Sequence, residues 1–71
     1  MIQAGSQAEI RCIVDAGHEA FYSPCTILNI SPKTVEIKYC AKVNFVGDRA
    51  EPVIKRDIIA RNKIVSIREL F

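Results

Sequence analysis

The sequence feature that most constrains the fold is an alternation of apolar and polar side chains over residues 34–45. The apolar positions, two residues apart, are Val35, Ile37, Tyr39, Ala41, Val43 and Phe45. The positions between them are polar apart from Cys40, namely Glu36, Lys38, Lys42 and Asn44. A two-residue period predicts a β-strand with one face toward a core, and no helix produces it. The run exceeds the usual strand of about five to six residues, so we expect it to bend or to pass between two sheets.

The alternation predicts where each side chain points only if the strand is regular. A one-residue β-bulge near Cys40 would turn Lys42 away from the face that carries Lys38. The apolar residues from Ala41 onward would then need a surface other than the core to pack against. In a regular strand the two lysines share a solvent-exposed face, and this is the arrangement that we expect.

Shorter strands are expected on both sides of this run. Residues 8–14, 25–30 and 64–68 are rich in β-branched residues, and the first of these segments also alternates. Residues 53–60 fit a short helix and a strand equally well. Pro24 lacks a backbone donor, so we expect it at the start or the edge of a strand. Turn signals separate the segments at residues 15–19, Ser31-Pro32-Lys33, Gly47-Asp48 and Arg61-Asn62-Lys63.

Five short strands between turns in a chain of 71 residues predict one all-β domain over residues 1–71. A small five-stranded SH3-like barrel, partly open and with at most one short helical turn, fits this spacing. A domain of this size buries only about 60% of the surface that its unfolded chain exposes. Because 49% of the residues are apolar, we expect apolar surface to remain for self-association, most simply as a homodimer.

No apolar run approaches the roughly 18 residues of a membrane span, and residues 1–6 show no secretory signal pattern. We therefore expect a cytoplasmic protein with no membrane partner. The three cysteines, Cys12, Cys25 and Cys40, are widely spaced and odd in number, which favours buried free thiols over disulfides. The cysteines and the single histidine, His18, lack the close ligand pairs of structural zinc sites, so we expect no metal.

No combination of residues predicts catalysis. The histidine lies between Gly17 and Glu19 in a predicted loop, and no cysteine has a histidine at a recognisable catalytic spacing. The sequence has no glycine-rich phosphate loop and no metal-binding motif. We expect a protein that is not an enzyme, has no cofactor and acts by binding.

Charge is distributed unevenly along the chain. Residues 1–30 contain one base and three acids, whereas residues 31–71 contain nine bases and five acids. A basic second half favours an anionic partner. The side chains that we select as candidates are Lys38, Lys42, Lys55 and Arg56. They predict a surface that follows a phosphate backbone, and the alternative is an ordinary solvated surface.

Aromatic residues supply a second kind of candidate. Phe21 and Tyr22 lie beside a glycine-containing loop, whereas Tyr39 and Phe45 share the apolar face of the long strand and are expected in the core. The stretch Phe21-Tyr22-Ser23-Pro24-Cys25-Thr26-Ile27-Leu28-Asn29-Ile30, followed by Thr34-Val35-Glu36-Ile37-Lys38-Tyr39, resembles the second and third strands of Tudor-type SH3-like barrels. This resemblance covers about half of the chain. It implies that Phe21 or Tyr22, together with Tyr39, lines an aromatic cage for methylated lysine or arginine.

The sequence as a whole predicts a non-catalytic regulatory binding module. The preferred partner is a nucleic acid or a nucleic-acid-associated protein, because of the basic second half. The alternative is a protein–protein interaction module or a homo-oligomeric structural module. The predicted binding residues are Phe21, Tyr22, Lys38, Tyr39, Lys42, Lys55 and Arg56.

Overall fold

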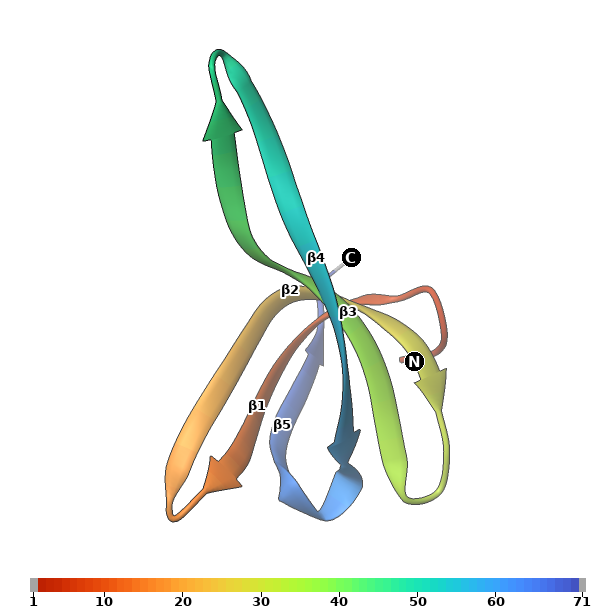
Figure 1. The fold of residues 1–71 in the computed structure, drawn as a ribbon. Coiled ribbons are helices and arrows are strands. Elements are labelled where there is room, and N and C mark those ends of the chain that lie inside the picture. Colours follow the sequence, from red (N-terminus) through yellow and green to blue (C-terminus); the bar gives the residue numbers. More distant parts are fainter. Residues whose placement is uncertain (1, 71) are drawn as a thin grey trace.

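A computed structural model describes residues 2–70, so the expected domain of residues 1–71 includes two terminal residues that lie outside the description. The five strands are β1 (Gln7–Asp15), β2 (His18–Ile30), β3 (Thr34–Val46), β4 (Arg49–Ala60) and β5 (Ile64–Glu69). All five form one antiparallel sheet in the order β4-β3-β2-β1-β5 (Figure 1). The only helical segment among the described residues is the 3-10 helix η1 (Arg61–Lys63). The all-β prediction is confirmed, and residues 53–60 belong to a strand.

The sheet curves into a bowl but does not close into a barrel. Its two edge strands, β4 and β5, are joined in sequence through η1 but do not pair with each other. Figure 1 shows β3 and β4 continuing beyond the bowl as a long hairpin (green to cyan), which gives the molecule its extent of 43 × 30 × 17 Å. The expected bending of the long strand is confirmed, and it occurs where β3 leaves the bowl.

The core lies inside the bowl and comes from alternate positions of β1, β2 and β3, with one residue added from the edge strand β4. Its members are Ala8, Ile10, Cys12, Cys25, Ile27, Val35, Ile37 and Ile59. The largest fully buried side chains are three isoleucines, one on each central strand. Burying an isoleucine contributes about 1.5–3 kcal/mol. So few large buried side chains therefore leave the domain with a narrow margin of stability.

The regular alternation that the sequence predicted for β3 ends at a β-bulge. Cys40 pairs with Ile54, but the next pair joins Lys42 to Val53, which leaves Ala41 without an opposite residue. Val35 and Ile37 face the core as predicted. Beyond the bulge the two faces exchange, so the prediction that Ala41, Val43 and Phe45 continue the core face is wrong. The physical reason is the extra residue, which changes the parity of the alternation.

Strand β2 is longer than the sequence predicted. It begins at His18, so the expected loop over residues 15–19 shrinks to a tight turn in which Gly17 has φ +86°. Pro24 lies within β2 and not at its start, but β2 pairs with β3 only from Cys25 onward, so Pro24 is at a locally unpaired edge of the strand, as predicted. At that point β2 has two residues between pairing positions, Ser23 and Pro24, where β1 has only Glu9. The bulge accommodates a residue that cannot donate a ladder hydrogen bond.

Candidate binding surface

The part of the hairpin that extends beyond the bowl, residues 40–54, is here named the arm. It contains the last residues of β3, the first residues of β4 and a turn in which Gly47 has φ +63°. None of its residues belongs to the buried core, and every residue except Val53 is exposed. The arm therefore has no packing partner within the bowl, and its side chains are available for contact with another molecule.

The arm has one apolar face and one mixed face. Cross-strand pairs on the first, here named the outer face, are Cys40–Ile54, Val43–Pro52 and Phe45–Ala50. Three of these side chains are strongly exposed: Val43 at 46%, Ile54 at 55% and Phe45 at 76%. The pairs on the opposite, inner face are Lys42–Val53, Asn44–Glu51 and Val46–Arg49. A contiguous exposed apolar strip on a small domain indicates an interaction surface.

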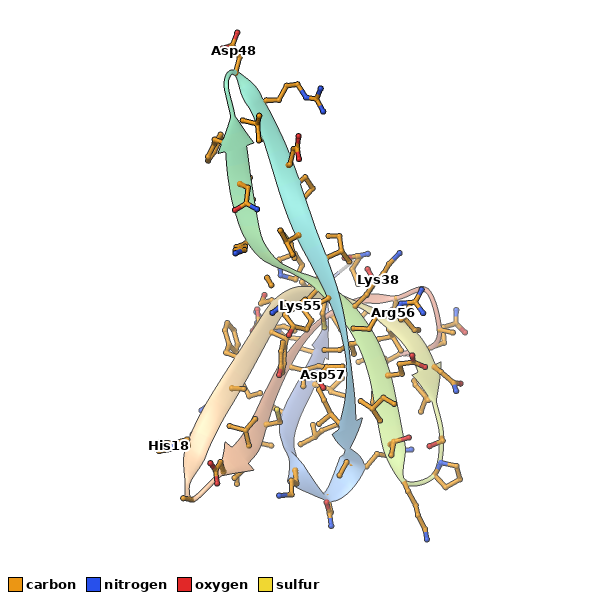
Figure 2. The ribbon with its side chains drawn as sticks, viewed as in Figure 1. His18, Lys38, Asp48, Lys55, Arg56 and Asp57 are labelled. Carbon is orange, nitrogen blue, oxygen red and sulfur yellow. The ribbon has the colours of Figure 1, made fainter. Side chains whose placement is uncertain are left out.

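Four cations surround the base of the arm and are here named the basic collar: Lys38, Lys42, Lys55 and Arg56. Lys38 and Arg56 are directly opposite each other on the outer face, whereas Lys55 and Lys42 lie on the inner face. Figure 2 shows Lys38 and Arg56 together on one side of the strand pair and Lys55 on the other. The prediction that Lys38 and Lys42 share a face is wrong, because the bulge at Ala41 lies between them.

The collar side chains are not neutralised by the chain itself. None of the four makes an ion pair with residues 2–70, whereas Arg11 pairs with Glu19 and Arg68 pairs with Glu9. Like charges directly opposite each other on neighbouring strands are destabilising. The Lys38–Arg56 pair is thus an uncompensated positive site that an anion would stabilise.

A surface pocket of about 240 Å³ lies where the outer face of the arm meets β1 and β2. Its lining consists of Gln7, Pro24, Cys25, Thr26, Lys38, Tyr39, Cys40 and Ile54. The Gln7 amide Nε2 donates a hydrogen bond to Thr26 Oγ1 at 2.8 Å. Thr26 is opposite Lys38 in the β2–β3 ladder. The pocket therefore joins the apolar strip of the arm to the outer half of the collar.

Two of the predicted binding aromatics lie together on the inner side of the bowl. The rings of Tyr22 and Tyr39 have centroids 4.8 Å apart and planes tilted by 59°. The Tyr22 hydroxyl donates a hydrogen bond to Asp57 Oδ2 at 3.1 Å. Burial, followed by this bond, raises the pKa of Tyr22 to about 12. Phe21, which precedes Tyr22 in β2, is exposed opposite Arg11 and is not part of this cluster.

This geometry restricts what the tyrosines can bind. An aromatic cage holds a cation in a space between its walls. Here the two rings contact each other and one hydroxyl is engaged by a carboxylate, so a methylammonium group would have to separate them. The cluster instead connects β2 with β4 across the bowl. No pattern in the sequence pointed to Asp57, because its inward position depends on the register of a strand that also fitted a helix.

The cysteines differ in their surroundings. Cys12 and Cys25 are buried, and burial raises the pKa of both thiols. Cys40 is exposed at the bulge, where its Sγ donates to the Lys42 carbonyl at 3.3 Å. The prediction of three buried thiols is therefore wrong for Cys40, which lies on the outer face with Lys38, where the regular alternation before the bulge already places it.

Residues 2–70 hold no group of three or more His, Cys, Asp and Glu side chains that could bind a metal ion. His18, labelled in Figure 2, is exposed at the start of β2. Within the same residues, no helix has the length and apolar character needed to cross a membrane. Comparisons with protein-family models, with curated proteins and with solved structures found no match to the chain.

Proposed function

We propose that the chain is a non-catalytic binding module that engages the phosphate backbone of a nucleic acid through the basic collar. The observation that carries this proposal is the Lys38–Arg56 cross-strand pair, which has no carboxylate partner among residues 2–70. A bound phosphate would remove the repulsion between the two cations. Phosphate contacts made by lysine and arginine supply most of the affinity of non-specific nucleic-acid binding.

The expected mode of binding is independent of sequence. Phe45 is the exposed aromatic side chain on the same face as Lys38 and Arg56, but it lies six residues along β4 from their row, at the level of Ala50. Six residues of strand span about 20 Å. Stacking on Phe45 is therefore remote from the collar, and charge rather than base recognition should dominate the affinity.

The test is the salt dependence of binding to a fluorescently labelled, short single-stranded oligonucleotide. Four phosphate contacts give a slope of log K against log salt of about −3, since each contact contributes about −0.7 on a single strand. Neutralising the outer pair with Lys38→Gln and Arg56→Gln should reduce the slope by about half. Neutralising the inner pair with Lys42→Gln and Lys55→Gln should reduce the slope by a similar amount if the oligonucleotide contacts both faces of the arm.

A matched control neutralises two other exposed cations, Lys33 and Lys63, which lie in the turn before β3 and in η1, at the end of the bowl opposite to the arm (Figure 1). Lys33→Gln with Lys63→Gln removes the same charge and should leave the slope close to that of the natural protein. Absence of binding at low salt, or an equal loss in the control, would refute the role of the collar.

We propose further that the fold is an open SH3-like barrel. The support is the strand order, in which β1 lies between β2 and β5 and a short 3-10 helix precedes the last strand. In this scaffold the curved sheet is the structural part, and the extended β3–β4 hairpin is the part that differs in length and carries the binding residues.

A further inference from the structure

We propose that the outer face of the arm is an interface between two copies of this chain, packed face to face with the arms antiparallel about a two-fold axis. The interface consists of the apolar strip formed by Cys40, Val43, Phe45, Ala50, Pro52 and Ile54. This inference does not rest on nucleic-acid binding. It rests on the exposure of the strip, on the position of Pro52 and on the charges at the two ends of the arm.

The arm is a structure that lacks a core of its own. An isolated two-stranded hairpin is marginally stable in water, and independent stability requires packing of its apolar face. The outer face of the arm carries no residue that the bowl covers, and Phe45, its largest side chain, is 76% exposed. A second apolar strip of the same shape would supply the missing contact. A two-fold axis provides this second strip, because the outer face of one protomer then packs against the outer face of the other.

Association through the outer edge of β4 is disfavoured within the arm. Strand β4 is an edge strand, and its outer edge would offer backbone groups to another strand. Pro52 lies in this strand within the arm and has no N–H group to donate to an added strand. The same residue contributes an apolar ring to the outer face. Pro52 thus disfavours strand pairing along the outer edge of β4, and it adds to the apolar surface of the outer face.

Charge at the two ends of the arm selects the antiparallel arrangement. Asp48 lies at the tip (Figure 2), where the neighbouring Arg49 is already paired with Glu51 at 3.3 Å. The base of the same face carries Lys38 and Arg56. In an antiparallel pair, Asp48 of the partner subunit approaches these two cations, whereas a parallel pair would place cations against cations. Lys42 and Lys55, on the inner face, remain accessible to phosphate, whereas Asp48 of the partner subunit and a phosphate compete for Lys38 and Arg56. The dimer contact and phosphate binding are therefore alternative states of this outer pair.

The size of the face predicts a weak dimer. From Cys40 to Val46 the strand extends about 20 Å, and two strands give a width of about 10 Å. A face of this size is below that of stable obligate dimers. We therefore expect a weak, transient dimer, so that sedimentation must be measured up to the highest protein concentration that can be reached.

The first experiment compares two valines of the same strand by sedimentation velocity without nucleic acid. Val43 lies on the outer face, and Val46 lies on the inner face with 60% exposure. Val43→Glu should raise the dissociation constant at least about tenfold, because it places a charge in the apolar contact. Val46→Glu should leave it unchanged. Circular dichroism on both variants verifies that the fold is retained.

The second experiment tests the direction of the arms by exchanging charges. Asp48→Lys alone and Arg56→Asp alone should each weaken the dimer, and the two together should restore it. Oxidation of Phe45→Cys should give a disulfide between Cys40 of one protomer and the introduced thiol of the other. A parallel dimer would instead join the two introduced thiols, and this product would overturn the antiparallel arrangement. A strictly monomeric natural protein at millimolar concentration, or equal effects of the two valine variants, would overturn the interface itself.

Discussion

The hydrogen bond between Tyr22 and Asp57 connects β2 with β4, two strands that are separated by β3 in the sheet. The substitution Tyr22→Phe removes the hydroxyl and leaves the ring packed against Tyr39. A hydrogen bond to a charged group contributes about 1.5–3 kcal/mol to the free energy of unfolding. Both side chains are partly exposed, so Asp57 regains water in the variant and the lower end, about 1.5 kcal/mol, is expected. For a domain of this length the melting temperature should fall by about 6–12 °C.

The pH dependence of this difference follows from the direction of the pKa shift. In the folded protein the pKa of Tyr22 is raised from 10.0 to about 12, mainly by burial and then by the bond to Asp57. The folded state therefore holds the phenolic proton more tightly than the unfolded state does. The stabilisation is fully present below pH 10 and is lost as the pH rises through about 12. Two pKa units correspond to at most about 2.7 kcal/mol, and partial exposure to solvent reduces this to about 1.5 kcal/mol.

The assay is urea unfolding of the natural protein and the Tyr22→Phe variant at a series of pH values from 7 to 12. Only the difference between the two proteins is interpreted, because effects of high pH that do not involve the Tyr22 hydroxyl cancel in it. Tyr39→Phe is the control, since the Tyr39 hydroxyl makes no hydrogen bond with residues 2–70. The difference for Tyr22→Phe should be constant up to about pH 9 and should then shrink. A difference that is independent of pH, or absent at pH 7, would refute the reasoning.

Three further predictions concern the core, the thiols and the arm. Ile37→Ala should lower the free energy of unfolding by about 3 kcal/mol because it leaves a cavity. The control Ile58→Ala, at a position 64% exposed, should change this free energy by less than about 0.5 kcal/mol. Equal losses of the two variants in urea unfolding would contradict the core assignment. Cys40 should react with one equivalent of a thiol reagent in the folded protein, and mass spectrometry should detect labelling of the two buried cysteines only on unfolding. Gly47→Ala should cost about 1 kcal/mol in thermal unfolding, because Gly47 has φ +63°, and an unchanged melting temperature would show that the turn relaxes.

The sequence was sufficient for the fold class and for half of the long strand. The all-β class and the inward position of Val35 and Ile37 follow from a two-residue period, which the backbone imposes on any regular strand. The period says nothing of where an extra residue enters. The bulge at Ala41 results from the pairing of β3 with a distant strand, and this pairing is a tertiary property. The later residues of β3, from Ala41 to Phe45, were therefore assigned to the wrong faces, and the structure has the bulge near Cys40 that was considered as the exception to a regular strand.

The candidate site was predictable in composition but not in arrangement. The four collar residues were selected from the sequence because they are bases close to or opposite the long strand. Their distribution over two faces depends on the bulge and on the register of β4. The strand pattern did not predict the contact of Tyr22 with Tyr39, because it began the second strand at residue 25; only the family resemblance placed Phe21 or Tyr22 beside Tyr39. Asp57 was missed because residues 53–60 fitted a helix as well as a strand. Local pattern specifies which residues are exposed or buried in a regular element, but not which elements meet.

The absence of core residues from the arm also has a consequence for motion. Opening of the hairpin tip breaks only the ladder between β3 and β4 and exposes no buried isoleucine, so it does not require the bowl to unfold. Amide hydrogens of residues 43–52 should then exchange with solvent much faster than those of Ile10, Ile27 and Ile37, whose exchange requires nearly global unfolding. An occupant of the outer face would slow exchange in the arm alone. Hydrogen exchange would therefore report the occupancy of this surface without any label, since the arm can open as a unit separate from the bowl.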